Sequence, residues 1–182
     1  MKEIRIHGRG GQGGVMIVRM LAAAQVLEGK WASGFPSFGM ERRGAPIMAF
    51  ARFDDKPIWE KTRVYNPDCL VVIDSGFISS PTLFDGIKPD STLILNAPKP
   101  VKKQLHKNIS LIGSVDATKI GLEEVGIAVT NTAMLGAFAR TTGWVQLDSL
   151  LSILGDYFTG DKLEQNKKCV ERGFKEAESV RF

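Results

Sequence analysis

Apolar and polar residues follow each other along the first part of the chain with two different periods. Residues 3–7 (EIRIH) alternate with a period of two, which is typical of a strand. From Val15 to a stop at Glu28, apolar residues recur at the spacing of a helix. Between these segments, five glycines occupy the seven positions 8–14. A strand, a glycine loop and a long helix in this order predict the start of a βα unit.

Short apolar segments in the middle of the chain predict further strands. Residues 69–74 are almost continuously apolar and end in an acid, the pattern of a strand buried on both faces. Residues 47–53 and 57–60, joined by Asp54-Asp55-Lys56, are expected to form a β-hairpin. The remaining short strands are predicted at residues 31–35, 91–96 and 109–113.

The last third of the chain predicts three helices, at residues 130–141, 147–158 and 161–180. Asp161 is the expected N-cap of the last helix, because Glu164 follows three residues later. The alternation of strands and helices, with one β-hairpin, predicts an α/β fold: a three-layer α/β/α sandwich on a mostly parallel mixed sheet. We find no internal repeat and no low-complexity linker, so residues 1–182 are expected to form a single domain.

Composition and charge narrow the class of protein. Hydrophobic content of 43% and charged content of 24% are ordinary for a soluble folded chain. No apolar run approaches the roughly 18 residues that cross a bilayer, and the chain enters its first strand directly, so we expect a cytoplasmic protein without a signal peptide. A net charge of +4 is mild. It suits an anionic ligand or an acidic partner subunit, and it does not indicate nucleic acid.

Cysteine and histidine give no sign of a catalytic or metal site in this chain. Cys69 and Cys169 are too few to ligate a four-iron cluster, and we expect both to be structural and reduced. His7 is expected to be packed beside the glycine loop, and His106 lies in a lysine-rich stretch that we expect to be a solvated surface. No set of residues forms a recognisable nucleophile or acid–base pair.

The glycine loop matches the pattern GxGxxG between a strand and a helix. Glycines allow backbone amides to approach an anion, and a helix N-terminus adds unpaired N–H groups and partial positive charge. Gly10, Gly11, Gln12 and Gly13 are therefore candidate binding residues. A dinucleotide site also requires an acid at the end of the second strand, but that strand ends in Ser33-Gly34-Phe35. In a third interpretation, the glycines only form a tight turn.

A second candidate segment carries charges between glycines. Arg42 and Arg43 follow Glu41 in a predicted loop, and arginine pairs bidentately with carboxylate or phosphate. They would hold an anionic cofactor beside the glycine loop, form salt bridges to another subunit, or simply brace the loop through Glu41. The large apolar residues of the same loop favour an interface. These residues are Phe35, Phe38 and Met40.

Together the two segments resemble a known family. GRGGQGG, followed about 22 residues later by FPSFGMERRGAP, resembles the gamma subunits of pyruvate and 2-ketoisovalerate ferredoxin oxidoreductases. The similarity extends through residues 66–74 and 131–137. It implies a subunit of a complex that oxidatively decarboxylates a 2-oxoacid, forms the acyl-CoA and reduces ferredoxin. The other subunits would carry thiamine diphosphate, its magnesium and the [4Fe–4S] clusters.

The resemblance also implies what this chain contributes. It would be inactive alone and would border the coenzyme A site of the assembled enzyme, with Gly10, Gly11, Gln12 and Gly13 as the cradle and Arg42 and Arg43 as possible partners. The ERRGAP form favours pyruvate or a branched-chain 2-oxoacid over 2-oxoglutarate as the substrate. Two alternatives stay open: an assembly subunit whose loop binds no ligand, and a stand-alone dinucleotide-dependent reductase.

Overall fold

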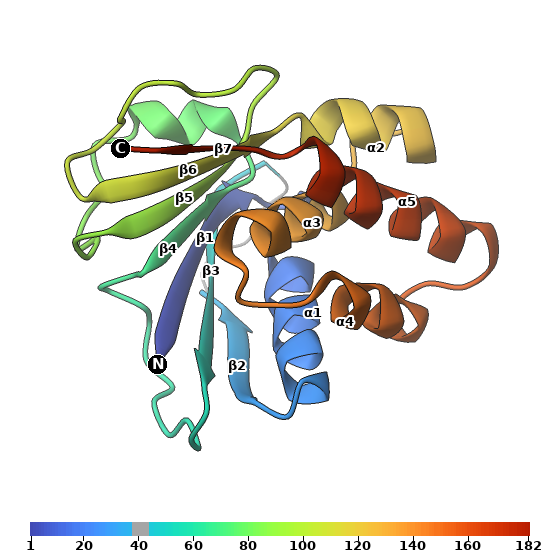
Figure 1. Cartoon of the computed structure of the whole chain (residues 1–182), viewed down its shortest axis with the longest axis horizontal. Helices are drawn as coiled ribbons and strands as arrows, with labels where there is room; N and C mark the ends of the chain where they lie inside the picture. Colours follow the sequence, from blue (N-terminus) through green and yellow to red (C-terminus); the bar gives the residue numbers. More distant parts are fainter. Residues whose placement is uncertain (38–43) are drawn as a thin grey trace.

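A seven-stranded mixed sheet forms the centre of the computed structural model, which describes residues 1–37 and 44–182 (Figure 1). Its order is β2-β3-β1-β4-β5-β6-β7. The four strands β1, β4, β5 and β6 run parallel, and β2, β3 and β7 add antiparallel pairs at the two sides. The strand bounds are β1 Lys2–Arg9, β2 Trp31–Pro36, β3 Pro46–Asp54, β4 Cys69–Val72, β5 Ser91–Asn96, β6 Ile109–Val115 and β7 Glu178–Arg181.

Burial explains the parallel centre of the sheet. All four residues of β4 are buried, as is typical of a parallel strand covered on both faces. One face packs against helices around a large apolar core that includes Ile4, Ile6 and Phe138. The helices are α1 Gly14–Leu27, α2 Ala117–Val125, α3 Asn131–Thr142, α4 Leu147–Ile153 and α5 Gly160–Glu176.

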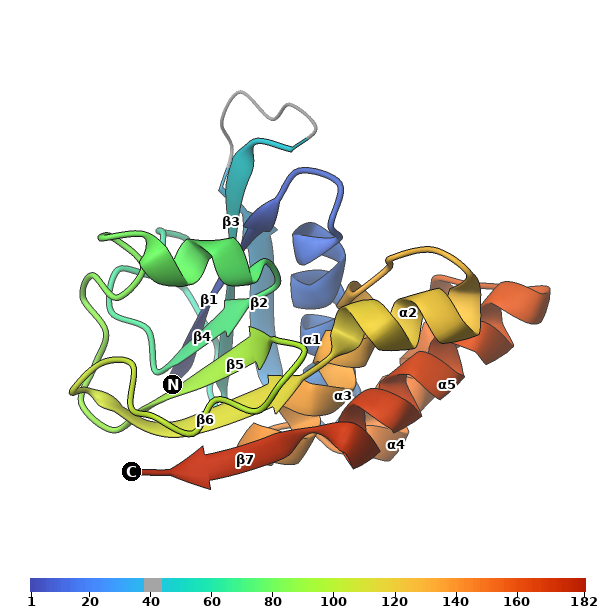
Figure 2. The same cartoon turned by 90° about the horizontal axis from the view of Figure 1, so that it is seen from above.

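The opposite face has a thinner cover (Figure 2). The 3₁₀ helix η1 (Ser75–Ser79) and the turns that follow it pack on a smaller core around Leu70, Leu93 and Ile112. The predicted α/β fold on a mixed sheet is confirmed, with η1 and irregular segments as its second outer layer.

Two glycines bring α3 and α5 into backbone contact. A Cβ atom at Gly136 would collide with the carbonyl oxygen of Val170, and one at Gly173 would collide with that of Ala133. Only glycine permits this approach. The close packing fixes the position of α3, whose first turn lies beside the glycine loop.

The predicted hairpin between residues 47–53 and 57–60 is wrong. Residues 57–60 form no strand, and β3 instead pairs with β2, from Trp31 opposite Asp54 to Pro36 opposite Ala49. The carbonyls of Thr62 and Arg63, in the same connection, accept hydrogen bonds from Arg52, which holds this segment as a loop.

The last helices are also shorter than predicted. After α4 the chain continues only as a short 3₁₀ turn, η2 (Leu154–Asp156). The last helix, α5, begins at Gly160 with Thr159 as its N-cap, so Asp161 lies in the first turn and is not the cap. It ends at Glu176, where the chain becomes β7 and pairs with β6. Helix α2 was not predicted; the side chain of Asp116 caps it by accepting from the amide of Lys119, at 2.9 Å.

Candidate functional site

The glycine loop turns the chain from the carboxyl end of β1 into α1. Gly11 and Gly13 have φ of 93° and 80°, in the left-handed region that favours glycine. The amide of Gly10 donates to the carbonyl of Ala45 at 2.9 Å, and the amide of Gly44 donates to that of Gly10 at 3.1 Å. The loop is therefore tied to the segment that leads into β3.

The start of α1 keeps backbone donors without an acceptor in the helix. The first bond of the helix runs from the amide of Ile17 to the carbonyl of Gly13, at 3.0 Å, which leaves the amides of Gly14, Val15 and Met16 outside the helical ladder. Gly13 has no side chain to cap them, and the first turn contains no acidic residue. In contrast, aspartates cap both α2 and η1. The α1 N-terminus therefore offers amides and a partial positive charge to an anion.

The start of α3 lies directly against this loop. A Cβ atom at Gly13 would stand 2.8 Å from Nδ2 of Asn131, the first residue of α3. Asn131 is buried, and its Nδ2 lies 3.1 Å from the sulfur of Met16. The hydroxyl of Thr130, the N-cap residue of α3, is buried and finds no hydrogen-bond partner among the described residues. The N-cap residues of α1 and α3 thus make no side-chain cap bond within the described structure, and both helix starts adjoin one loop; at α3 the amide of Thr132 instead donates to Asn131 Oδ1 at 3.0 Å.

Arg9, Gln12 and Asp74 brace the loop from the other side. Arg9 Nε donates to Asp74 Oδ2 at 2.7 Å, and Gln12 Nε2 lies 3.4 Å from the same oxygen. Burial raises the pKa of Asp74, but the hydrogen bonds from Arg9 and the amide of Gly76 outweigh it, so its pKa lies below the usual value. The carboxylate therefore stays charged and joins the ends of β1 and β4.

This point of the sheet is a topological switch. After β1 the chain crosses to the helical face through α1, whereas after β4 it crosses to the opposite face through η1. In open α/β sheets, ligands bind outside the carboxyl ends of the strands where the direction changes in this way. The glycine loop lies at that place.

The topology argues against a dinucleotide site. Such a site needs the second strand beside the first, with its terminal acid facing the loop. Here β2 is an edge strand, separated from β1 by β3. The parallel neighbour of β1 is β4, and Asp74 after β4 is engaged by Arg9 and by η1.

A hollow of about 390 Å³ opens beside the loop on the α1 side. Arg19, one turn into α1, and Tyr157, after η2, contribute its larger polar side chains. Burial and nearby Asp156 raise the pKa of Tyr157, and Arg19 acts in the opposite direction. Neither residue was predicted from the sequence. Arg19 follows Val15 by four positions, and this spacing places it on the same face of the helix as the first turn. No feature of the sequence near Tyr157 indicates that it reaches this hollow.

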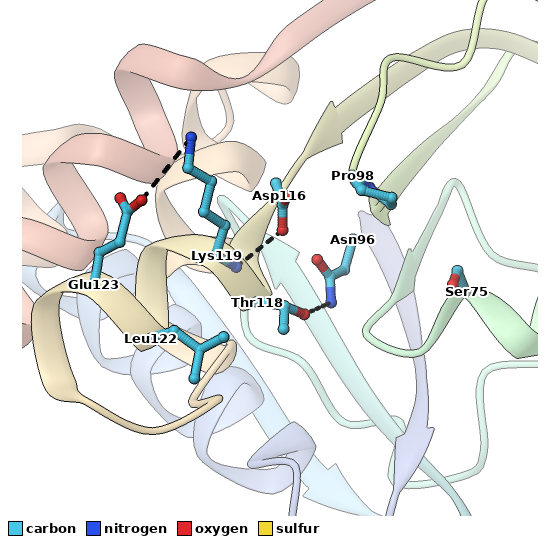
Figure 3. Close-up of a pocket in the computed structure, with 8 residues that line it drawn as sticks. All are labelled: Ser75, Asn96, Pro98, Asp116, Thr118, Lys119, Leu122 and Glu123. Atoms are coloured by element: carbon cyan, nitrogen blue, oxygen red, sulfur yellow. Dashed lines mark hydrogen bonds and ion pairs between the residues drawn. The ribbon is translucent and has the colours of Figure 1, made fainter.

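A second, larger hollow of about 510 Å³ lies at the carboxyl ends of β4, β5 and β6 (Figure 3). Its polar groups bind one another. Asn96 Nδ2 donates to Thr118 Oγ1 at 3.0 Å, while Asn96 Oδ1 accepts from the amide of Ala117 at 3.0 Å. Lys119 pairs with Glu123 at 3.9 Å. These contacts hold α2 in place, so the glycine loop is the stronger candidate site.

The structure brings together only some of the site residues predicted from the sequence. Gly10, Gly11, Gln12 and Gly13 come together in the loop, but Gln12 Oε1 accepts from the amide of Arg9 at 2.7 Å and serves the loop itself. Arg42 and Arg43 lie outside the described residues, as do Phe38 and Met40. Phe35 is half-buried, and its ring centroid is 5.6 Å from that of Phe50.

The cysteines and His7 are interior residues. Cys69 and Cys169 are buried free thiols, and burial raises the pKa of each. Burial first, and the charge of Arg5 second, lower the pKa of His7 to about 4, so the ring is neutral and accepts from Arg5 Nε at 3.1 Å. Across residues 1–37 and 44–182, no group of three or more His, Cys, Asp or Glu could hold a metal ion. Within the same ranges, no helix is both long and apolar enough for a membrane span.

Comparison with known proteins assigns the class. The model of the pyruvate ferredoxin/flavodoxin oxidoreductase family matches residues 3–176. The common gamma subunit of the pyruvate/ketoisovalerate oxidoreductases of Pyrococcus abyssi is 43% identical and is matched over 98% of both chains. The gamma subunit of the NADH-dependent phenylglyoxylate dehydrogenase of Aromatoleum evansii is 48% identical, over 97% of this chain and 94% of its own.

A solved structure agrees with this assignment. The crystal structure of a pyruvate oxidoreductase subunit from Thermotoga maritima superposes with a TM-score of 0.87 at 36% identity, over 99% of this chain and 98% of that one. The chain belongs to the pyruvate ferredoxin/flavodoxin oxidoreductase family. Within that family it corresponds to the gamma subunit over nearly its whole length, as the glycine loop and the ERRGAP segment predict.

Proposed function

We propose that this gamma subunit holds a phosphate group of coenzyme A at its glycine loop. Partner subunits would carry thiamine diphosphate, its magnesium and the [4Fe–4S] clusters. The assembled cytoplasmic enzyme would oxidatively decarboxylate pyruvate or a branched-chain 2-oxoacid to the acyl-CoA and reduce ferredoxin. The observation that carries the proposal is the α1 N-terminus, whose first amides have no helical acceptor and no side-chain cap.

The chemistry of the loop suits a phosphate. Amides from Gly14, Val15 and Met16 converge with the positive end of the α1 dipole, and the buried start of α3 lies alongside. Coenzyme A carries a diphosphate and a further phosphate, so it supplies the required anions. The hollow beside the loop, with Arg19 and Tyr157, gives room for the groups next to a bound phosphate. Arg42 and Arg43 remain sequence candidates for a second anion contact.

The role of this chain would be to bind and orient. Its residues fix one end of the cofactor while bond making and breaking take place on groups held by other subunits, and positioning of this kind accelerates a reaction by itself. The named relatives act on pyruvate, ketoisovalerate or phenylglyoxylate, which are all 2-oxoacids. One of them is NADH-dependent. We therefore place the choice of oxoacid and of electron acceptor in the other subunits.

A charge introduced at the first turn of α1 tests the proposal. Val15→Asp puts a carboxylate among the amides that would hold the phosphate, and Val15→Asn is the neutral control of nearly the same shape. In the assembled complex, Val15→Asp should raise the apparent KM for coenzyme A at least about tenfold. Two like charges about 4 Å apart near a protein surface repel each other by about 4 kcal/mol, and a tenfold change needs only about 1.4 kcal/mol. The KM for the 2-oxoacid should change little, and so should both constants in Val15→Asn.

The same experiment separates the alternatives. An acid near a helix N-terminus stabilises an empty helix by about 0.3–1 kcal/mol, so Val15→Asp should not unfold the chain. If both variants assemble and the KM for coenzyme A is unchanged, the loop is structural and the chain is an assembly subunit. If the purified chain alone oxidised NADH or NADPH, the dinucleotide-dependent reductase would replace both of these functions.

A further inference from the structure

Exposed apolar side chains gather at the end of the molecule opposite the glycine loop. Of the nine large hydrophobic residues exposed in the described structure, six lie where β1 begins, and we call these six the amino-end face. Figure 1 shows the N-terminus, the turn from α1 to β2 and the loop after β3 together at this end. The six are Met1, Val26, Leu27, Trp31, Trp59 and Tyr65.

The topology brings these residues to one end. Helix α1 returns antiparallel to β1, so Val26 and Leu27 at its end come back to the level where β1 starts. Trp31, the first residue of β2, stands opposite Asp54, the last residue of β3. Trp59 and Tyr65 belong to the loop that follows β3. A concentration of exposed apolar groups of this kind marks an interaction surface.

Trp59 is the most exposed of the six, at 87%, and the segment that follows it is tied to the sheet by hydrogen bonds. Arg52, 1% exposed, donates to the carbonyl of Thr62 at 2.7 Å and to that of Arg63 at 3.2 Å. Arg5, also buried, donates to the carbonyl of Tyr65 at 3.3 Å. A tryptophan presented by a preorganised loop loses little entropy on docking, and tryptophan is enriched among the residues that dominate interface energies.

A recess accompanies the projecting side chain. A hollow of about 290 Å³ opens on the same end between Met1, Lys2, Lys30, Asp55 and Trp144. The face thus offers an anchor for a partner pocket and a pocket for a partner side chain, the arrangement of a shaped protein interface.

Charge selects the kind of partner. Three acids of this end are engaged within the chain: Asp54 with the amino terminus at 3.1 Å, and Glu3 and Glu60 with Arg52. Asp55 is exposed and forms no salt bridge within the described residues, but the cations of this end outnumber it. The cations around the face point to an acidic partner. They are Lys2, Lys30, Lys56, Lys61 and Arg63. A second copy docking by the same face would set these cations against each other, which costs several kcal/mol by order of magnitude.

We infer that the amino-end face docks onto a different subunit of the oxidoreductase complex, which receives Trp59 in an apolar pocket rimmed by carboxylates. This contact lies at the opposite end of β1 from the proposed coenzyme A cradle. The glycine loop thus remains available for the cofactor while the subunit is anchored.

The test uses the complex purified through an affinity tag on this chain. Trp59→Ser removes the anchor, and Leu122→Ser removes an exposed apolar side chain of α2, 51% exposed and outside the face. The subunits that accompany the wild-type chain are identified and quantified by mass spectrometry. With Trp59→Ser, their yield should fall at least tenfold, while Leu122→Ser should match the wild type. Equal melting temperatures of the isolated chains show that each variant folds.

A charge reversal tests the nature of the partner. Lys61→Glu with Arg63→Glu should weaken assembly, and Lys168→Glu on α5 should not. In the wild type the association should weaken as salt rises. The inference is overturned if Trp59→Ser assembles as the wild type does, or if it only abolishes a dimer of the isolated chain. If Val15→Asp leaves the KM for coenzyme A unchanged, the inference about the amino-end face still stands, because assembly and cofactor affinity are measured separately.

Discussion

The two ends of β1 use hydrogen-bond donors in opposite ways. At the carboxyl end, the glycine loop leaves the first amides of α1 without an acceptor in the helix. At the amino end, the buried guanidinium groups of Arg5 and Arg52 have carbonyls, His7 and carboxylates as acceptors. The first end leaves donors free, whereas the second uses donors to hold a loop and leaves apolar side chains exposed. If both proposals hold, β1 separates the binding end of the subunit from its docking end.

The strongest way to break this contrast is to remove the buried guanidinium of Arg52. Arg52→Ala leaves a void and deprives the carbonyls of Thr62 and Arg63 of a donor, so the free energy of unfolding should fall by about 3–5 kcal/mol. Arg63→Ala, in the same loop but exposed, should change it by no more than about 0.5 kcal/mol. Urea unfolding of the isolated chain measures both free energies. Equal losses in the two variants would contradict the role of Arg52 in holding the loop.

Acid should destabilise the chain through His7, the buried acceptor of Arg5 near the carboxyl end of β1. Burial lowers the pKa of His7 to about 4, below its usual 6.5. Between pH 4 and 6.5 the imidazole is therefore protonated in the unfolded chain but neutral in the folded chain. Stability should therefore fall as the pH drops from about 6.5 to 4, by about 3 kcal/mol. His7→Gln keeps an acceptor for Arg5 but does not titrate, and it should flatten this part of the stability profile. A ring that NMR shows titrating near 6.5 would refute the prediction.

The contact between Gly13 and α3 sharpens the comparison at the carboxyl end. Gly13→Ala must adopt positive φ and also meet Asn131, so it should destabilise the chain by about 2–3 kcal/mol. Gly143 has φ of 64°, and no atom of the described residues lies within 4 Å of the place where its Cβ would stand, so Gly143→Ala should cost only about 1 kcal/mol. Thermal unfolding of the two variants gives the part of the destabilisation that comes from the contact between residue 13 and Asn131. Equal losses of stability would show that Asn131 moves aside at little cost.

Local patterns were sufficient for the parts of the fold that depend on local chemistry. The strand, glycine loop and helix at residues 3–28 were predicted, because glycine content and helical spacing are properties of a short segment. The partner of β3 was not, since Asp54-Asp55-Lys56 has the composition of a hairpin turn while the observed partner, β2, precedes β3. Strand β7 was assigned to the last helix, because its four residues become a strand only by pairing with β6.

The candidate site divides in the same way. Gly10 to Gly13 were found from their spacing, but the brace that holds them depends on Asp74, which is 65 positions from Arg9. The approach of Asn131 to Gly13 likewise needs the packing of α3, which two glycines at the α5 crossing determine. A single sequence gives no distance between such residues. The structure adds the brace and the second helix start to the predicted loop.

The edges of the sheet influence what happens to this subunit before it meets its partners. Strand β2 contains Pro36, which has no N–H to donate, and α1 packs so closely on Gly34 that a Cβ there would lie 2.7 Å from the carbonyl of Val18. Strand β7 is only four residues long and carries the exposed Glu178 and Arg181. Short, charged or proline-bearing edges resist the addition of strands from other molecules. We therefore expect the free subunit not to add its own copies to these edges as β-aggregates.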